Sequence, residues 1–349
     1  MRYLVLAAIG ALASILANRG IAVFNDGFRP IVPQFYDGQI SRKELATMSF
    51  AISFGLVIGF AIPTSIAASI ILIHCILLTT DIIGTFCPDS LVGTVIAGVV
   101  GAAYGVAILL GLESIVNLFG SLPFNFLANL GSVSSFVTAA FAIFPSVAVG
   151  YQHGFKKGAI AGLITLVVYL LTVKFGKFAL GDAKVALNGF GMAMLAGMVC
   201  LLAFATGVKG TGDANSSLVT TFGDKVKRIR ANWWLLAIMG GLVAMATSLG
   251  IVAGDPISLG LVSEGSWAEA AMVALARAIG FVPLVFTTAI VTGVYGPAGS
   301  TFVFVVGLLL HGNPFVAVIV GAVVMVVELA LINVFAKGMD KFPGMKDMG

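Results

Sequence analysis

The chain has 349 residues, of which 59% are hydrophobic and only 10% are charged, and its formal net charge is +4. A soluble domain carries about 25% charged residues, so this composition excludes an ordinary water-soluble protein. It favours one integral membrane domain over residues 1–349. The small positive charge does not indicate a nucleic-acid partner, because the basic residues fall between apolar runs, where they orient a membrane protein.

Apolar runs long enough to cross a bilayer recur along the whole chain. A spanning helix needs about 20 residues, so the run 45–80 is divided at Pro63 into two spans. The pattern predicts an all-α, polytopic transmembrane bundle of about eleven spans, with residues 114–133 and 293–311 either crossing or re-entering the membrane. The predicted spans lie near 3–24, 45–62, 64–80, 90–112, 134–152, 158–173, 189–207, 232–253, 268–292, 298–311 and 314–336.

Lysine and arginine are distributed unequally between alternate loops. If the N-terminus is outside, the cytoplasmic segments hold 13 of these residues and the outer segments hold 4. Because short basic loops remain in the cytoplasm, we expect an outer N-terminus and a cytoplasmic C-terminus. The outer residues are Arg2, Lys174, Lys177 and Lys184.

A first polar group follows the first apolar run. It includes Arg19, Asp26, Arg29 and Gln34, and two prolines three residues apart interrupt any helix there. Irregular backbone at membrane depth is tolerated only against protein or a water-filled cavity, and arginine forks bind anionic groups. These four residues are therefore candidates for substrate binding. An ordinary cytoplasmic loop is the alternative.

A second group contains His74 and Asp81, which are seven residues apart and would share one face of a continuous helix. A buried acid near a histidine can relay protons or bind a cation. Asp81 is therefore a candidate for ion coupling, and its alternative role is to mark the end of a helix.

The third group begins at Arg277, which precedes Gly280–Pro283 and a stretch rich in hydroxyl groups and glycine. Unwound turns of this kind expose carbonyls and helix N-termini to ions and carboxylates. Arg277 is thus the fifth substrate-binding candidate. In the alternative, residues 264–277 form a surface helix and Arg277 extends its charge to the interface.

Glu328 is the only charged residue between Pro314 and Ala336. A carboxylate at that depth costs several kcal/mol unless it is protonated, paired or facing water. It is the second candidate for ion coupling, and an ion pair with Arg277 would relieve the cost of both charges.

An internal repeat is indicated only weakly. Gly27–Val32 resembles Gly280–Val285, but the prolines that follow these two segments do not keep the same spacing. Interrupted helices at matching positions in two halves are typical of transporters.

Motifs of catalysis and cofactor binding do not occur. The sequence has no GxxxxGK[ST], GxSxG or HExxH pattern, and Cys75, Cys87 and Cys200 show no paired spacing. We therefore expect no enzyme activity, no cofactor and no metal site.

The segment Ala22–Gln34 closely resembles the YhfT family of bacterial transport proteins. The similarity continues in order through Thr80–Gly84, Leu130–Ser135, Gly280–Tyr295 and Gly321–Glu328, and so covers nearly the whole chain. It implies a multi-pass inner-membrane transport protein without implying a substrate. Similar proteins continue past Pro343 with further apolar spans, so the resemblance implies either a shorter version of the family or a C-terminal part that a longer chain or another subunit would supply.

These observations favour a secondary transporter for a small polar or anionic metabolite, coupled to protons or sodium. Alternatives are the membrane component of a multi-component, phosphotransferase-like uptake system and a non-transporting membrane scaffold. The expected partners are a small-molecule substrate, the lipid bilayer, and either further copies of the chain or an additional membrane subunit.

Overall fold

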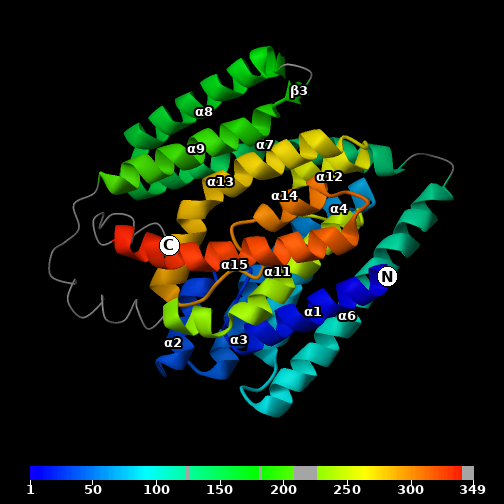
Figure 1. Ribbon diagram of the computed structural model, residues 1–349, viewed down its shortest axis with the longest axis vertical. Helices are drawn as coiled ribbons and strands as arrows, with labels where there is room; N and C mark the ends of the chain where they lie inside the picture. Colours follow the sequence, from blue (N-terminus) through cyan, green and yellow to red (C-terminus); the bar gives the residue numbers. More distant parts are fainter. Residues whose placement is uncertain (123–125, 181–182, 208–225, 340–349) are drawn as a thin grey trace.

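The computed structural model describes residues 1–122, 126–180, 183–207 and 226–339, and helices dominate it (Figure 1). This confirms the predicted helical class, with two small two-stranded sheets added. The helices are α1 (Arg2–Asn18), η1 (Arg29–Ile31), α2 (Val32–Tyr36), α3 (Arg42–Leu56), η2 (Val57–Ala61), α4 (Ile62–Ala68), α5 (His74–Phe86), α6 (Leu91–Gly120), α7 (Phe126–His153), α8 (Phe155–Phe175), α9 (Gly189–Thr206), α11 (Trp233–Ser248), α12 (Pro256–Ser263), α13 (Trp267–Thr292), α14 (Phe302–Leu309) and α15 (Pro314–Met339). The strands are β1 (Ile71–Leu72), β2 (Lys177–Leu180), β3 (Ala183–Ala186) and β4 (Val252–Ala253).

The number of spans differs from the prediction. Among the described residues, four helices are long and apolar enough to cross a membrane, or five if the two parts of α13, bent by 41°, count as one. Eleven spans are therefore not confirmed. Extended segments interrupt several predicted spans, so that α1, α5 and α11 are apolar but shorter than a span, and α9 is also too short although it covers most of the predicted span 189–207. The four long helices are Arg42–Ala68, Leu91–Leu118, Phe155–Phe175 and Pro314–Ala336.

The division of residues 45–80 at Pro63 is wrong. The chain stays helical from Arg42 to Ala68, because a π-helical turn places Pro63 in the first turn of α4, where its missing N–H costs little. The helix ends instead at Ser69, whose φ is +57°. Strand β1 follows it.

Four of the described helices continue at their C-terminal ends as extended chain: α1, α4, α11 and α13. Each extended segment of the N-terminal half pairs with an extended segment of the C-terminal half. Strand β1 lies parallel to β4, and Ala22 after α1 forms a parallel bridge with Tyr295 after α13. The N–H of Ile71 donates to the carbonyl of Ile251, and the N–H of Tyr295 donates to that of Ile21. This pairing satisfies backbone groups that the interrupted helices leave open.

Helices α1 and α11 end in the same way. Gly20 and Gly250, which are 230 residues apart, have φ values of +57° and +69°. The N–H of Ile21 donates to the carbonyl of Leu16, five residues back, and Ile251 repeats this bond with Ala246. Two positions that require a left-handed turn thus share one local structure.

The two helices belong to related units that run in opposite directions. Helix α1 packs antiparallel on α6 where Gly10 meets Gly101, and α11 packs antiparallel on α15 where Gly240 meets Gly321. Helices α1 and α11 themselves run in opposite senses, and Nη2 of Arg228, just before α11, donates to the carbonyl of Arg19 at the end of α1 (Figure 1). Residues 2–120 and 233–339 therefore form an inverted repeat.

This repeat has a different register from the one that the sequence indicated. Gly27–Val32 follows the first interruption, whereas Gly280–Val285 lies inside α13. The matching of these two segments is wrong, because a shared proline and glycine pattern here reflects two different bends. Helices α7, α8 and α9 lie outside the repeat and pack on one another (Figure 1). They meet the repeat where α9 contacts α13 and where α7 contacts α4.

Candidate functional site

A cavity of about 470 Å³ lies where the interrupted helices meet. Both inverted units contribute to its wall: Phe24 follows Gly20 by four residues, and Gly254 follows Gly250 by four residues. The cavity thus lies between the two units. Its polar lining residues are Asn25, Asp26, Arg29, His74, Arg277 and Thr301.

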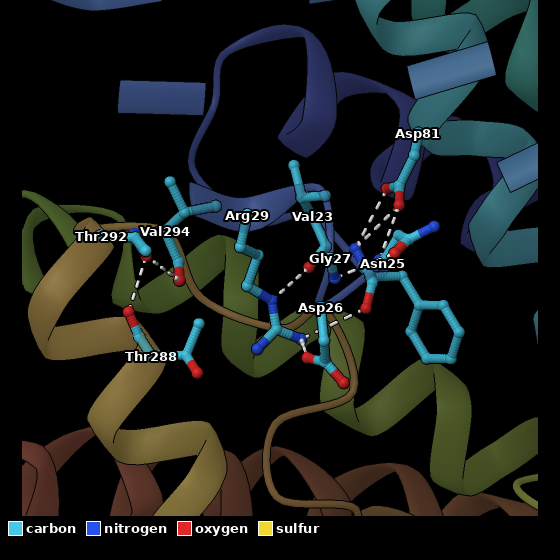
Figure 2. A network of polar contacts seen from close by, with 10 residues as sticks. Val23, Asn25, Asp26, Gly27, Arg29, Asp81, Thr288, Thr292 and Val294 are labelled. Carbon is cyan, nitrogen blue, oxygen red and sulfur yellow. Dashed lines mark hydrogen bonds and ion pairs between the residues drawn. The ribbon is translucent and has the colours of Figure 1, made fainter. Parts of the chain in front are cut away.

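Arg29 enters the cavity from the start of η1, and only 3% of the residue is exposed. Its Nε donates to the carbonyl of Val23 at 2.8 Å, and its Nη2 donates to that of Phe24 at 3.3 Å. Nη2 also lies 2.9 Å from the carboxylate of Asp26, whose side chain is 65% exposed (Figure 2). Nη1 is buried without a hydrogen-bond partner among the described residues, so the N–H groups of this arm of the guanidinium are unsatisfied.

Arg277 on α13 enters the same cavity from the second unit. Its Nη1 donates to the carbonyl of Gly254 at 2.6 Å and lies 3.6 Å from the carboxylate of Asp255. Nε and Nη2 are buried and have no partner within the described part of the chain. A side chain at Gly254 would approach Nη2 to 2.5 Å, so only glycine lets the guanidinium lie this close to the backbone.

Asp81 lies behind the cavity wall and is buried. Both of its carboxylate oxygens accept from the N–H of Phe24 at 3.1 Å, and one also accepts from the N–H of Asn25 at 2.9 Å (Figure 2). No hydrogen bond joins it to His74, although both side chains belong to α5. Asp81 therefore anchors the first interruption, and its coupling role stays a prediction.

Glu328 on α15 is buried beside the loop between α13 and α14. Its Oε2 accepts from the hydroxyl of Tyr295 at 2.7 Å and from the N–H of Ser300 at 2.6 Å. Its Oε1 has no partner among the described residues, and neither have the hydroxyls of Ser300 and Thr301. The expected ion pair with Arg277 is absent, because the guanidinium of Arg277 lies against Asp255 instead.

Arg19 and Gln34 do not join this cavity. Arg19 caps the end of α1, is exposed, and lines a separate polar cleft with Tyr36 and Arg228. Gln34 is half-buried on the short helix α2 and is not among the described lining residues. Of the five predicted substrate-binding residues, the structure brings together Asp26, Arg29 and Arg277.

Several polar residues of the site were not predicted from the sequence. Asp255 caps α12, with its Oδ1 accepting from the N–H of Ser258, and it also neighbours Arg277. The Asp-Pro pair at 255–256 is a helix-start signal that indicates this cap. Tyr295 and Ser300 lie in the hydroxyl-rich stretch that follows Arg277. No local pattern predicts their contact with Glu328, because that contact joins distant parts of the chain.

Within the described residues, no cluster of three or more histidine, cysteine, aspartate or glutamate side chains has a geometry that could bind a metal ion.

Comparison with known proteins places the chain in a family. Residues 2–349 match the YhfT family, whose description is "Protein of unknown function". The chain is 34% identical over 363 aligned positions to "Uncharacterized protein YhfT" of Escherichia coli (strain K12), which covers 99% of this chain and 81% of that protein. No solved structure matches the fold. A match over nearly the whole length, together with this identity, shows that the chain belongs to the YhfT family.

Proposed function

We propose that this protein is a secondary transporter that moves a small organic anion across the bacterial inner membrane by alternating access. The cavity between the two inverted units, with free N–H groups on Arg29 and Arg277, supports this most directly. Transporters built from inverted repeats hold their substrate at the repeat interface, between interrupted helices. Irregular backbone at membrane depth is costly except where it lines a cavity or packs against protein.

The chemistry of the two arginines favours an anion. A guanidinium has five N–H donors and no acceptor, so a group that completes its hydrogen bonds must be an acceptor. Carboxylates accept such bonds in pairs. Asp26 lies beside Arg29 and Asp255 beside Arg277, and these neighbours offset the arginine charges while the cavity is empty of anion.

Glu328 is the residue that we expect to couple transport to protons or sodium. Its Oε1 and the hydroxyls of Ser300 and Thr301 are three buried oxygen groups without partners among the described residues. Protonation would remove the negative charge of this buried carboxylate, and a sodium ion could take oxygen ligands from the same turn. Asp81 would act indirectly, through the backbone of Phe24 and Asn25 that forms the cavity wall.

The location and assembly are part of the same proposal. The long apolar helices and the basic segments near Lys156 and Arg228 favour a multi-pass protein of the inner membrane, with the N-terminus outside and the C-terminus in the cytoplasm. The functional unit is either an oligomer of this chain or a complex with another membrane subunit.

A ligand screen on the detergent-purified protein tests the central claim. A ligand that binds only the folded state raises its stability by about 2.7 kcal/mol at a hundredfold excess over Kd. We expect at least one small carboxylate to raise the melting temperature of the wild type, and Arg277→Gln to abolish this shift. Arg230→Gln, an exposed basic residue outside the cavity, should keep it. An equal shift in wild type and Arg277→Gln would refute the site.

A further inference from the structure

The wall of the central cavity is largely aromatic. Five phenylalanine side chains line it, from both inverted units and from α7, and aliphatic residues fill much of the remaining surface. The volume of about 470 Å³ falls within the range for sites that enclose a drug-sized ligand. The five residues are Phe24, Phe60, Phe144, Phe281 and Phe304.

Two of these rings flank the arginine of the second unit. The guanidinium carbon of Arg277 lies 5.9 Å from the ring centre of Phe281 and 5.6 Å from that of Phe304. These distances are within the range of attraction between a cation and an aromatic face. The free Nε and Nη2 of Arg277 therefore lie beside aromatic surface, so a ligand that accepts their bonds also contacts the rings.

The opposite unit contributes a second aromatic corner. The ring of His74 meets Phe24 edge-on at 4.9 Å and Phe60 at 5.5 Å. Its Nδ1 is buried without a partner among the described residues. A further planar ring could pair with these aromatic side chains by offset stacking or by edge-to-face contact. His74, Phe24 and Phe60 thus add to the aromatic surface that a planar ligand could contact.

This lining is unsuited to a polyhydroxylated anion. Each hydroxyl of a sugar acid would lose its water on entry, and most would face phenylalanine instead of a hydrogen-bond partner. A small dicarboxylate would fill little of the volume and would leave the rings uncovered. Both ligand types could accept hydrogen bonds from the arginines, but neither would make favourable contacts with the aromatic wall.

Building on the proposed anion transport, we infer that the substrate is an aromatic carboxylate. Its carboxylate accepts from the free N–H groups of Arg277 and Arg29, and its planar apolar body packs against Phe24, Phe281 and Phe304. The arginines therefore select a negatively charged group, and the phenylalanines select the aromatic part of the same ligand.

Three chemical probes separate these two requirements. The purified protein is titrated with 3-phenylpropionate, with the uncharged 3-phenylpropanamide, and with gluconate, and Kd is measured by calorimetry. We expect 3-phenylpropionate to bind at least tenfold more tightly than either of the others. Gluconate binding as tightly as 3-phenylpropionate, with loss in Arg277→Gln, would overturn the inference and leave anion binding intact. If none of the anions binds and none is taken up by proteoliposomes, the proposed transport fails as well.

Matched ring variants locate the binding. Phe281→Leu should weaken 3-phenylpropionate binding about tenfold, and Phe304→Leu provides a second reading if the first variant folds poorly. Phe155→Leu, at a position that is 86% exposed at the start of α8, removes a ring outside the cavity and should leave Kd unchanged. Unchanged affinity in folded Phe281→Leu and Phe304→Leu would overturn the inference.

Discussion

The buried charges differ in how completely their hydrogen bonds are satisfied. Asp81 has N–H donors on both oxygens, whereas Glu328 has donors on Oε2 alone, and Arg29 and Arg277 each keep free N–H groups. A buried polar atom without a partner is costly. Asp81 therefore has the environment of a structural anchor, and the other three have that of groups awaiting a ligand, an ion or a proton.

The variant Glu328→Gln tests whether Glu328 couples transport to protons or sodium. The amide keeps the size of the side chain but cannot change protonation state and binds cations weakly. We expect the variant to bind anion while losing any dependence of binding on sodium or pH that the wild type shows. The measurement is Kd with and without sodium and across pH. Glu264→Gln, on an exposed residue, should behave as the wild type, and persistence of the dependence in Glu328→Gln would remove Glu328 from coupling.

At the level of secondary structure, the extended segments that interrupt the helices stabilise one another by pairing. In the extended segment after α1, the carbonyl of Ile21 accepts a hydrogen bond from the N–H of Tyr295. Strand β1 likewise pairs with β4. Two-residue strands have little stability alone, so each interruption persists only because its partner in the other unit is present. Asp81 then adds bonds from α5 to the turn at Phe24.

Replacing Asp81 with asparagine should destabilise the first interruption. The variant loses charge-assisted bonds to two N–H groups and brings an NH₂ group toward them, at a cost of roughly 2 kcal/mol. We expect a melting temperature several degrees below that of the wild type in detergent. Asp89→Asn provides the matched control, because Asp89 is exposed. Equal melting of the two variants would show that Asp81 does not anchor the turn.

The whole molecule combines the inverted repeat with a group of three other helices. Helix α8 belongs to that group and is one of the four long apolar helices. It has Lys156 near its start and Lys177 just after its end, and both are exposed. The accessibility of these two positions from outside the cell therefore reports how α8 is oriented in the membrane.

Single cysteines at these two positions test the orientation. In spheroplasts, a membrane-impermeant maleimide should label Lys177→Cys but not Lys156→Cys, and permeabilised cells should show both labelled. The native Cys75, Cys87 and Cys200 are buried, so unmodified protein serves as the background. Reversed labelling would invert the predicted orientation, and labelling of both positions in spheroplasts would show that α8 does not cross the membrane.

The sequence by itself determined the helical class, the family, and the residues whose burial is expensive. Glu328 was identified because a charge within an apolar run has a large desolvation cost, which is readable from the neighbouring residues alone. Arg29 and Arg277 were identified because each lies beside prolines and glycines that interrupt a helix. Only the tertiary structure decided the number of uninterrupted helices and the partners of these charges. The chain after Ser69 is extended because the carbonyl of Ile251 accepts the N–H of Ile71, and Arg277 pairs with Asp255 instead of Glu328. Such contacts join residues far apart in the chain, and local pattern does not specify which distant groups will satisfy a buried donor.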